Sequence, residues 1–127
     1  SNANQDIAYC FHSVEGYSKV GSYTGNGNAD GTFVFTGFRP AWILFKNTST
    51  TTNWEIYDTT RQPSNAALGP IYANLSNAEE SHATLPALDI LSNGFKPRST
   101  WAEFNTSGQT YIYLAIGSQP AKFSNAR

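Results

Sequence analysis

Apolar residues recur along this chain in short runs that are separated by glycine, proline, asparagine and serine. This spacing predicts strands, because an amphipathic helix would repeat its apolar positions every three to four residues. We therefore expect an all-β fold, an antiparallel, jelly-roll-like β-sandwich of about seven to nine strands with at most one short helical turn. The predicted strands are residues 7–14, 17–23, 32–38, 41–46, 54–58, 88–91, 95–96 (extended at 101–104) and 111–116.

Three local patterns predict how these strands are arranged. Asn93-Gly94 stands between two apolar runs and predicts a tight hairpin. Trp54–Asp58 alternates, which we interpret as Trp54 and Ile56 facing the core. Ala41–Phe45 is apolar throughout, so we expect this strand to be covered on both faces, either by the rest of the sandwich or by another copy of the domain.

Glycine-rich Gly25–Gly31 is predicted to be a turn that lets Phe33–Phe38 pair beside Ala41–Phe45. A phosphate cradle would need a following helix and, for the Walker type, a lysine, and this segment has neither. Ser76–Glu79 fits a capping box, so a helical turn running to about His82, or a structured loop, is expected there.

The composition narrows the class of protein. The length of 127 residues suits one domain; Ser1–Ala3 has the form of an expression-tag scar, and residues 7–127 are expected to form the sandwich. Charged residues make up 13% and the net charge is −1, which argues against a nucleic-acid partner. The apolar runs are too short for membrane insertion. Cys10 is the only cysteine, and we expect it to be a buried, inert thiol.

Candidate reaction chemistry is sparse. Glu55, Glu79 and Glu103 are the carboxylates that a glycan hydrolase could pair, but we interpret them as solvated charges. The chain also lacks the Gly-x-Ser-x-Gly nucleophile elbow. We therefore expect a protein that is not an enzyme and has no cofactor, metal site or catalytic residue.

Aromatic side chains are the better functional lead. Tyr17, Tyr57, Tyr72 and Trp101 are predicted to form a contact surface for a carbohydrate or a protein, since exposed rings beside Asn and Ser offer area and hydrogen bonds. Trp101 could instead cap the end of the sandwich.

One internal similarity links the two ends of the chain. Ile7–Phe11, followed by Lys19–Ser22, resembles Ile112–Ile116, followed by Lys122–Asn125. Two ordinary apolar strands would explain the match. A true repeat would make this domain one unit of a tandem array.

The phrases "VEGYSKVGSYTGNGNADGTFVFTGFRPAWILFK", "NLSNAEE", "LSNGFKPR" and "SGQTYIYLAIG" together resemble a repeated domain of tailed-bacteriophage structural proteins. Those proteins are described as tail fibres or adsorption-associated proteins. The resemblance implies a virion or extracellular location after synthesis in the host cytoplasm. It also implies neighbouring domains or subunits, or a host-surface glycan, as partners. The alternatives are a lectin-like carbohydrate-binding module of a cell-surface protein and, less favoured, a glycan hydrolase.

Overall fold

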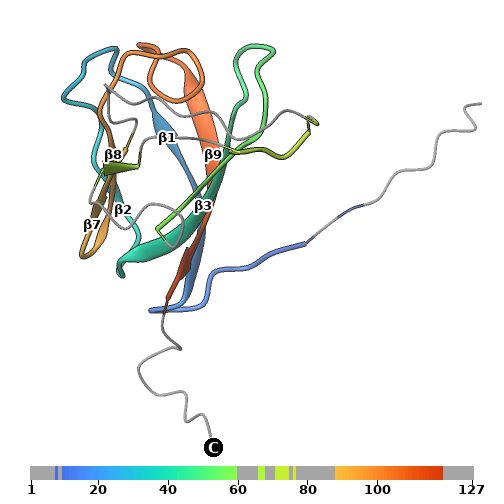
Figure 1. The fold of residues 1–127 in the computed structure, drawn as a ribbon, viewed down its shortest axis with the longest axis vertical. Helices are drawn as coiled ribbons and strands as arrows, with labels where there is room; N and C mark the ends of the chain where they lie inside the picture. Colours follow the sequence, from blue (N-terminus) through green and yellow to red (C-terminus); the bar gives the residue numbers. More distant parts are fainter. Residues whose placement is uncertain are drawn as a thin grey trace, which may run out of the picture.

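The computed structural model describes residues 8, 10–59, 71–74, 76 and 88–118, and residues 66–67 as backbone only. Two antiparallel sheets lie face to face within this part of the chain, which confirms the all-β sandwich (Figure 1). The larger sheet has the order β1-β9-β3-β4-β6 and the smaller has the order β2-β8-β7-β5. The strands are β1 (Ser18–Thr24), β2 (Val34–Phe35), β3 (Pro40–Asn47), β4 (Glu55–Asp58), β5 (Ala66–Ala67), β6 (Ile71–Tyr72), β7 (Leu88–Leu91), β8 (Gly94–Pro97) and β9 (Thr110–Gly117).

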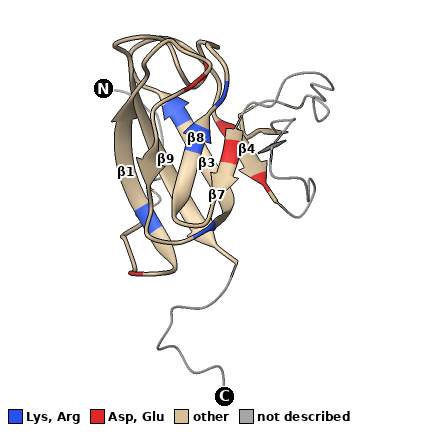
Figure 2. Ribbon diagram, turned by 90° about the vertical axis from the view of Figure 1, so that its left-hand side faces the viewer, with Lys and Arg blue, Asp and Glu red and all other residues tan. Residues whose placement is uncertain are grey.

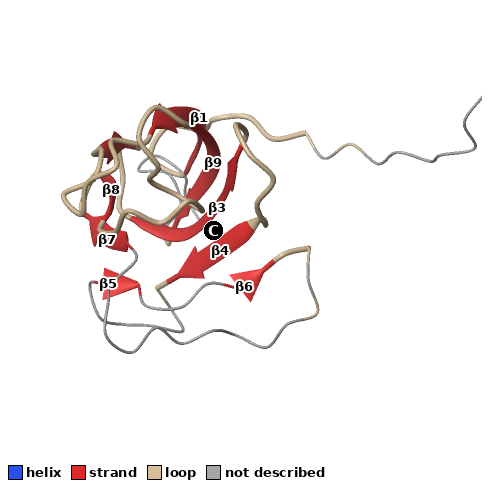
Figure 3. Cartoon of the chain, turned by 90° about the horizontal axis from the view of Figure 1, so that it is seen from above, coloured by secondary structure: helices blue, strands red, loops and turns tan. Residues whose placement is uncertain are grey.

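The connections are jelly-roll-like. The chain passes from β1 in the larger sheet to β2 in the smaller one and back to β3, and it returns from β8 to β9 at the end. The first strand therefore pairs with the last, and the second with the one before it, as in a jelly roll. The hairpins β3–β4 and β7–β8 extend the two sheets, and β6 beside β4 and β5 beside β7 form their outer edges (Figure 3). No helix within the described residues is long and apolar enough to cross a membrane.

Residues 32–38 and 41–46 do not pair with each other, contrary to the prediction. Only Val34–Phe35 forms a strand, and it pairs with β8 in the smaller sheet, whereas β3 pairs with β4 and β9. Gly37 explains the difference, because its φ of +85° turns the chain sharply between the two segments. The backbone N–H groups of Thr36 and Gly37 both donate to the Asn93 carbonyl, which anchors this turn to the β7–β8 hairpin.

The predicted strand at residues 7–14 is also wrong over its described part. Residues 10–13 form no strand, and Val14 makes only an isolated bridge to Ser18. Cys10 is exposed rather than buried, because this segment borders the larger sheet from outside and does not enter the sandwich. Of the predicted helical turn from Ser76 to His82, only Ser76 lies within the described residues.

The core between the sheets is built largely from aromatic rings. Tyr23 stacks on Tyr111 at a centroid distance of 5.0 Å, and Phe95 meets Tyr113 edge-on at 5.3 Å. The hydroxyl of Tyr23 donates to the Phe104 carbonyl at 2.9 Å. Such bonds let tyrosine serve as a core residue, because a buried hydroxyl without a partner would be costly.

Strand β4 alternates as predicted, but its two faces are reversed. Glu55 and Tyr57 are each 1% exposed and face the core, whereas Trp54 is 37% exposed and lies on the outside. The hairpin register decides this, because Glu55 lies opposite Phe45, and Tyr57 opposite Ile43. Paired residues share a face of the sheet, so Glu55 and Tyr57 face the core because their partners Phe45 and Ile43 do.

Candidate functional site

The outer face of the larger sheet is apolar along the middle of its strands. Val20 of β1 lies opposite Leu114 of β9, which lies opposite Leu44 of β3, which in turn lies opposite Ile56 of β4. Because paired residues share a face, these four side chains form one continuous row across the sheet. Ile112 and Trp42 belong to the adjacent rows of the same face.

Several of these side chains are open to solvent. Val20 is 42% exposed, Ile112 40% and Trp54 37%. An antiparallel sheet that faces water normally presents polar residues on that side. Leu114, which lies between Val20 and Leu44, is only 7% exposed, so the exposed apolar area is concentrated on Val20, Ile112 and Trp54. Exposed apolar area of this kind marks an interaction surface. We call it the outer-face patch, and its members are Val20, Trp42, Leu44, Trp54, Ile56, Ile112, Leu114 and Ile116.

A hollow of about 820 Å³ lies over this patch. Val20, Leu44, Ile112 and Trp54 line it from the sheet, and Ala73, which follows β6, lines it as well. None of the described residues that line it is charged. The hollow is therefore suited to apolar groups and offers few polar groups with which to orient a sugar.

An N-terminal segment, residues 10–14, borders the hollow, and we call it the arm. Val14 bridges to Ser18, and the Val20 N–H donates to Ser13 Oγ at 3.0 Å, so the arm is tied to β1 at these positions. Its N-terminal end points away from the body of the domain (Figure 1). Phe11 lines the hollow but remains 59% exposed, which shows that the arm covers the patch only partly.

The four predicted contact residues do not form one surface. Tyr17 is 41% exposed in the turn before β1, and Tyr72 is half-buried on β6. Strands β1 and β6 are opposite edges of a five-stranded sheet, which places them roughly 19 Å apart. Trp101 is partly buried and packs on Phe104 at 5.6 Å, in line with its alternative role as a cap.

Tyr57 must be corrected, because the structure places it in the core. Its side chain is 1% exposed and stacks on Phe45 at a centroid distance of 5.6 Å. Burial raises the pKa of Tyr57 well above its ordinary value, and the negative charge of Glu55 raises it further. A ring enclosed in this way cannot contact a ligand at the surface.

The carboxylates that were considered for glycan hydrolysis are not arranged in one described cleft. Glu55 faces the core at 1% exposure, and Glu103 is partly exposed in the loop before Phe104. Glu79 lies outside the described residues. Among the residues that the structure does describe, no three His, Cys, Asp or Glu side chains could hold a metal ion together.

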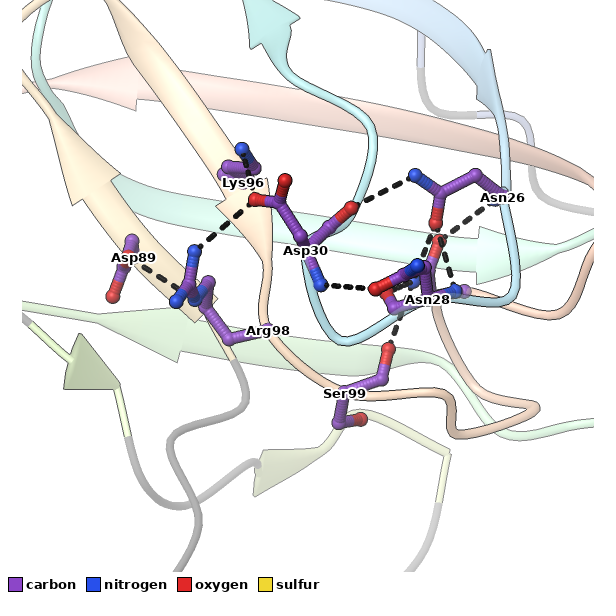
Figure 4. A network of polar contacts seen from close by, with 8 residues as sticks. Asn26, Asn28, Asp30, Asp89, Lys96, Arg98 and Ser99 are labelled. Atoms are coloured by element: carbon purple, nitrogen blue, oxygen red, sulfur yellow. Dashed lines mark hydrogen bonds and ion pairs between the residues drawn. The ribbon is translucent and has the colours of Figure 1, made fainter.

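The glycine-rich loop is held by a network of internal hydrogen bonds, shown in Figure 4. Asn105, which is fully buried, accepts from the Asn26 N–H at 3.0 Å and donates to the carbonyls of Asn28 and Ser99 at 2.6 and 2.8 Å. The side chain of Asn26 accepts from the Asn28 N–H at 2.9 Å. These polar atoms stabilise the bend, which agrees with its prediction as a turn.

Charged side chains next to this loop are paired with one another. Asp30 contacts Lys96 at 2.5 Å and Arg98 at 3.4 Å, and Arg98 also contacts Asp89 at 3.4 Å. The hydrogen bond from Lys96, followed by its charge, lowers the pKa of Asp30. Figure 2 shows charged residues on β7 and β8, whereas β9 carries none. Both sheets carry charge, because Lys19, Lys46, Glu55 and Asp58 lie on strands of the larger sheet.

Sequence analysis left open that another copy covers one face of residues 41–45, but it did not identify the outer-face patch as a whole, although two signals pointed to it. Ile112, Leu114 and Ile116 fall on one face of β9, and residues 41–45 are apolar on both faces of β3. Both signals were compatible with a strand buried on two sides. Only the register shows that these residues share an exposed face.

A family model described as "Domain of unknown function (DUF7483)" matches residues 1–120. No curated protein and no solved structure matches the chain.

Proposed function

The chain belongs to the family described as Domain of unknown function (DUF7483), and from this premise we propose that it is a non-enzymatic structural module. It docks on neighbouring copies or subunits of a larger assembly through the outer-face patch. The observation that carries the proposal is the exposed apolar face of the larger sheet, with Val20 and Ile112 about two-fifths exposed.

The proposed setting is a tail-fibre-like protein of a bacteriophage virion. The sequence resemblance supports this setting, and so does the internal similarity between Ile7–Phe11 and Ile112–Ile116, which suits a tandem array. Repeated modules multiply weak contacts, because each contact raises the effective concentration of the next. A module in such an array needs only modest affinity at each surface.

The chemistry of the outer-face patch favours a protein partner over a glycan. Its exposed members are mainly aliphatic, and they supply hydrophobic area without the hydrogen bonds that orient a sugar. A fully buried Val, Leu or Ile side chain contributes about 1.5–3 kcal/mol, so completing the burial of a half-exposed one contributes roughly 1 kcal/mol. A few such residues, packed against a complementary apolar surface, suit a weak contact that is repeated along an array.

Sedimentation velocity over a range of protein concentrations tests the proposal. Ile112→Lys places a charge in the outer-face patch at a position that is already 40% exposed, so the fold should survive. Phe35→Lys is the matched control, because Phe35 is 61% exposed on the smaller sheet. We expect the wild type to associate with rising concentration, Ile112→Lys to remain monomeric and Phe35→Lys to behave as the wild type.

Two results would contradict this function. One is a wild type that remains monomeric throughout, and the other is association that Ile112→Lys leaves unchanged. Glycan binding by a monomeric wild type, measured on a glycan array, would favour the lectin-like alternative.

A further inference from the structure

The arm exposes apolar side chains that a single copy of the chain leaves uncovered. Phe11 is 59% exposed, Val14 is 37% exposed and Cys10 is also exposed. Among the described residues, the contacts that fix the arm to β1 begin at His12, whose carbonyl accepts from Ser18 Oγ at 3.2 Å. Phe11 and Cys10 precede this hydrogen bond in the chain, so they can pack against another copy while the sandwich stays intact.

The hollow over the outer-face patch is apolar and open, and so it is complementary to the exposed apolar side chains of the arm. Cys10 and Phe11 of the same chain border it, and Val20, Ile112 and Trp54 remain exposed beneath it. One chain thus carries exposed apolar side chains on its arm and, next to them, an open apolar hollow that can receive such side chains. This is the arrangement in which two copies can satisfy each other by exchanging identical elements.

The sequence of the arm also suits a position against this sheet. Residues 7–11 resemble residues 112–116 of β9, the strand that pairs with β1. β1 is an edge strand, and beyond the Val14 bridge no described strand lies along its outer side. Within the arm this similarity covers Cys10 and Phe11, which correspond to Ala115 and Ile116 of β9 and are suited to an apolar sheet face.

We propose that two copies of this chain exchange arms, so that Phe11 and Cys10 of each copy lie in the hollow of the other. The proposal rests on the function above and names its partner as a second copy. The contact is symmetric, and the described residues that line the hollow are uncharged, so no like charges meet there. Each exchanged Phe11 covers the exposed area of Val20 and Ile112 in the partner.

The native Cys10 makes the exchange directly testable, because it is the only cysteine of the chain. Ile112→Cys adds a second thiol across the hollow, and mild oxidation is followed by non-reducing electrophoresis of the full chain. Exchange predicts a reducible covalent dimer that forms with both thiols present and disappears in Cys10→Ser/Ile112→Cys. A disulfide found only within monomers overturns the exchange, and so does the absence of any disulfide.

Phe11→Ser separates this proposal from the function on which it rests. We expect it to weaken the association seen in sedimentation by about tenfold, as the loss of roughly 1.4 kcal/mol of apolar contact implies. If Ile112→Lys abolishes association but Phe11→Ser leaves it unchanged, the exchange is wrong and the contact function stands. If Ile112→Lys has no effect, the contact function itself fails.

Discussion

Removing the Asn105 side chain should destabilise the domain, because this side chain holds the glycine-rich loop in place. Asn105 is fully buried and connects three segments through the Asn26 N–H and the carbonyls of Asn28 and Ser99. In Asn105→Ala, the bonds to Asn26 and Asn28 are lost at partly buried positions, where water can take the place of the amide. The Ser99 carbonyl lies in a buried setting and would remain without this partner.

The magnitude follows from these settings. Each partly buried bond that water can replace contributes about 1 kcal/mol, and an unsatisfied buried carbonyl costs about 1–3 kcal/mol. We expect Asn105→Ala to lower the free energy of unfolding by about 3–5 kcal/mol, and Tm by roughly 10–20 °C for a domain of this size. Urea unfolding followed by tryptophan fluorescence measures the first quantity, and calorimetry the second.

Asn28→Ala is the matched control for this measurement. Its side chain is exposed and caps only the Asp30 N–H, at 2.9 Å, so its loss should cost about 0.5–1 kcal/mol. If the two variants unfold within about 0.5 kcal/mol of each other, a level near the usual scatter of mutational data, the loop is not held by Asn105 and our reasoning is refuted.

Two further predictions concern backbone contacts and acid. Gly94→Ala would place a Cβ 2.1 Å from the Val34 carbonyl oxygen, so we expect it to lower the free energy of unfolding by about 3 kcal/mol. Gly108 has a φ of +75° but open space around it, so Gly108→Ala should lower that free energy by only about 1 kcal/mol. Equal losses for the two variants in urea unfolding would contradict this. Asp30 has a lowered pKa in the folded state, so its pairing with Lys96 stabilises the fold above the unfolded pKa of about 3.9. That stabilisation is lost as the pH falls through the lower folded pKa, so Tm should drop less between pH 5 and pH 3 in Asp30→Asn, and an equal drop would contradict the assignment.

Local patterns predicted the strands and hairpins of this fold well. The predicted β7–β8 hairpin is present, although its turn residues are Ser92 and Asn93 and Gly94 is the first residue of β8. Pro40–Asn47 and Glu55–Asp58 pair as expected, and Ser18–Thr24 is an edge strand. These features depend on turn residues and alternation within a few residues of one another. The sequence therefore carries them without knowledge of the tertiary arrangement.

Which face of each strand points toward the core could not be predicted in the same way. Trp54 was assigned to the core and Tyr57 to the surface on polarity, yet the register with Phe45 and Ile43 reverses them. The β3 strand is apolar on both sides, so its own pattern does not say which side meets the smaller sheet. That choice depends on long-range pairing with β9, and it decides where the functional surface lies.

Methyl NMR of the full chain over a range of concentrations tests the central claim most directly. If copies dock through the outer face of the larger sheet, the methyl signals of Val20 and Ile112 shift as association proceeds, whereas those of Leu91, on the smaller sheet, stay in place. Signals that move only on the smaller sheet, or do not move at all, would show that the outer face of the larger sheet is not where this domain makes contact.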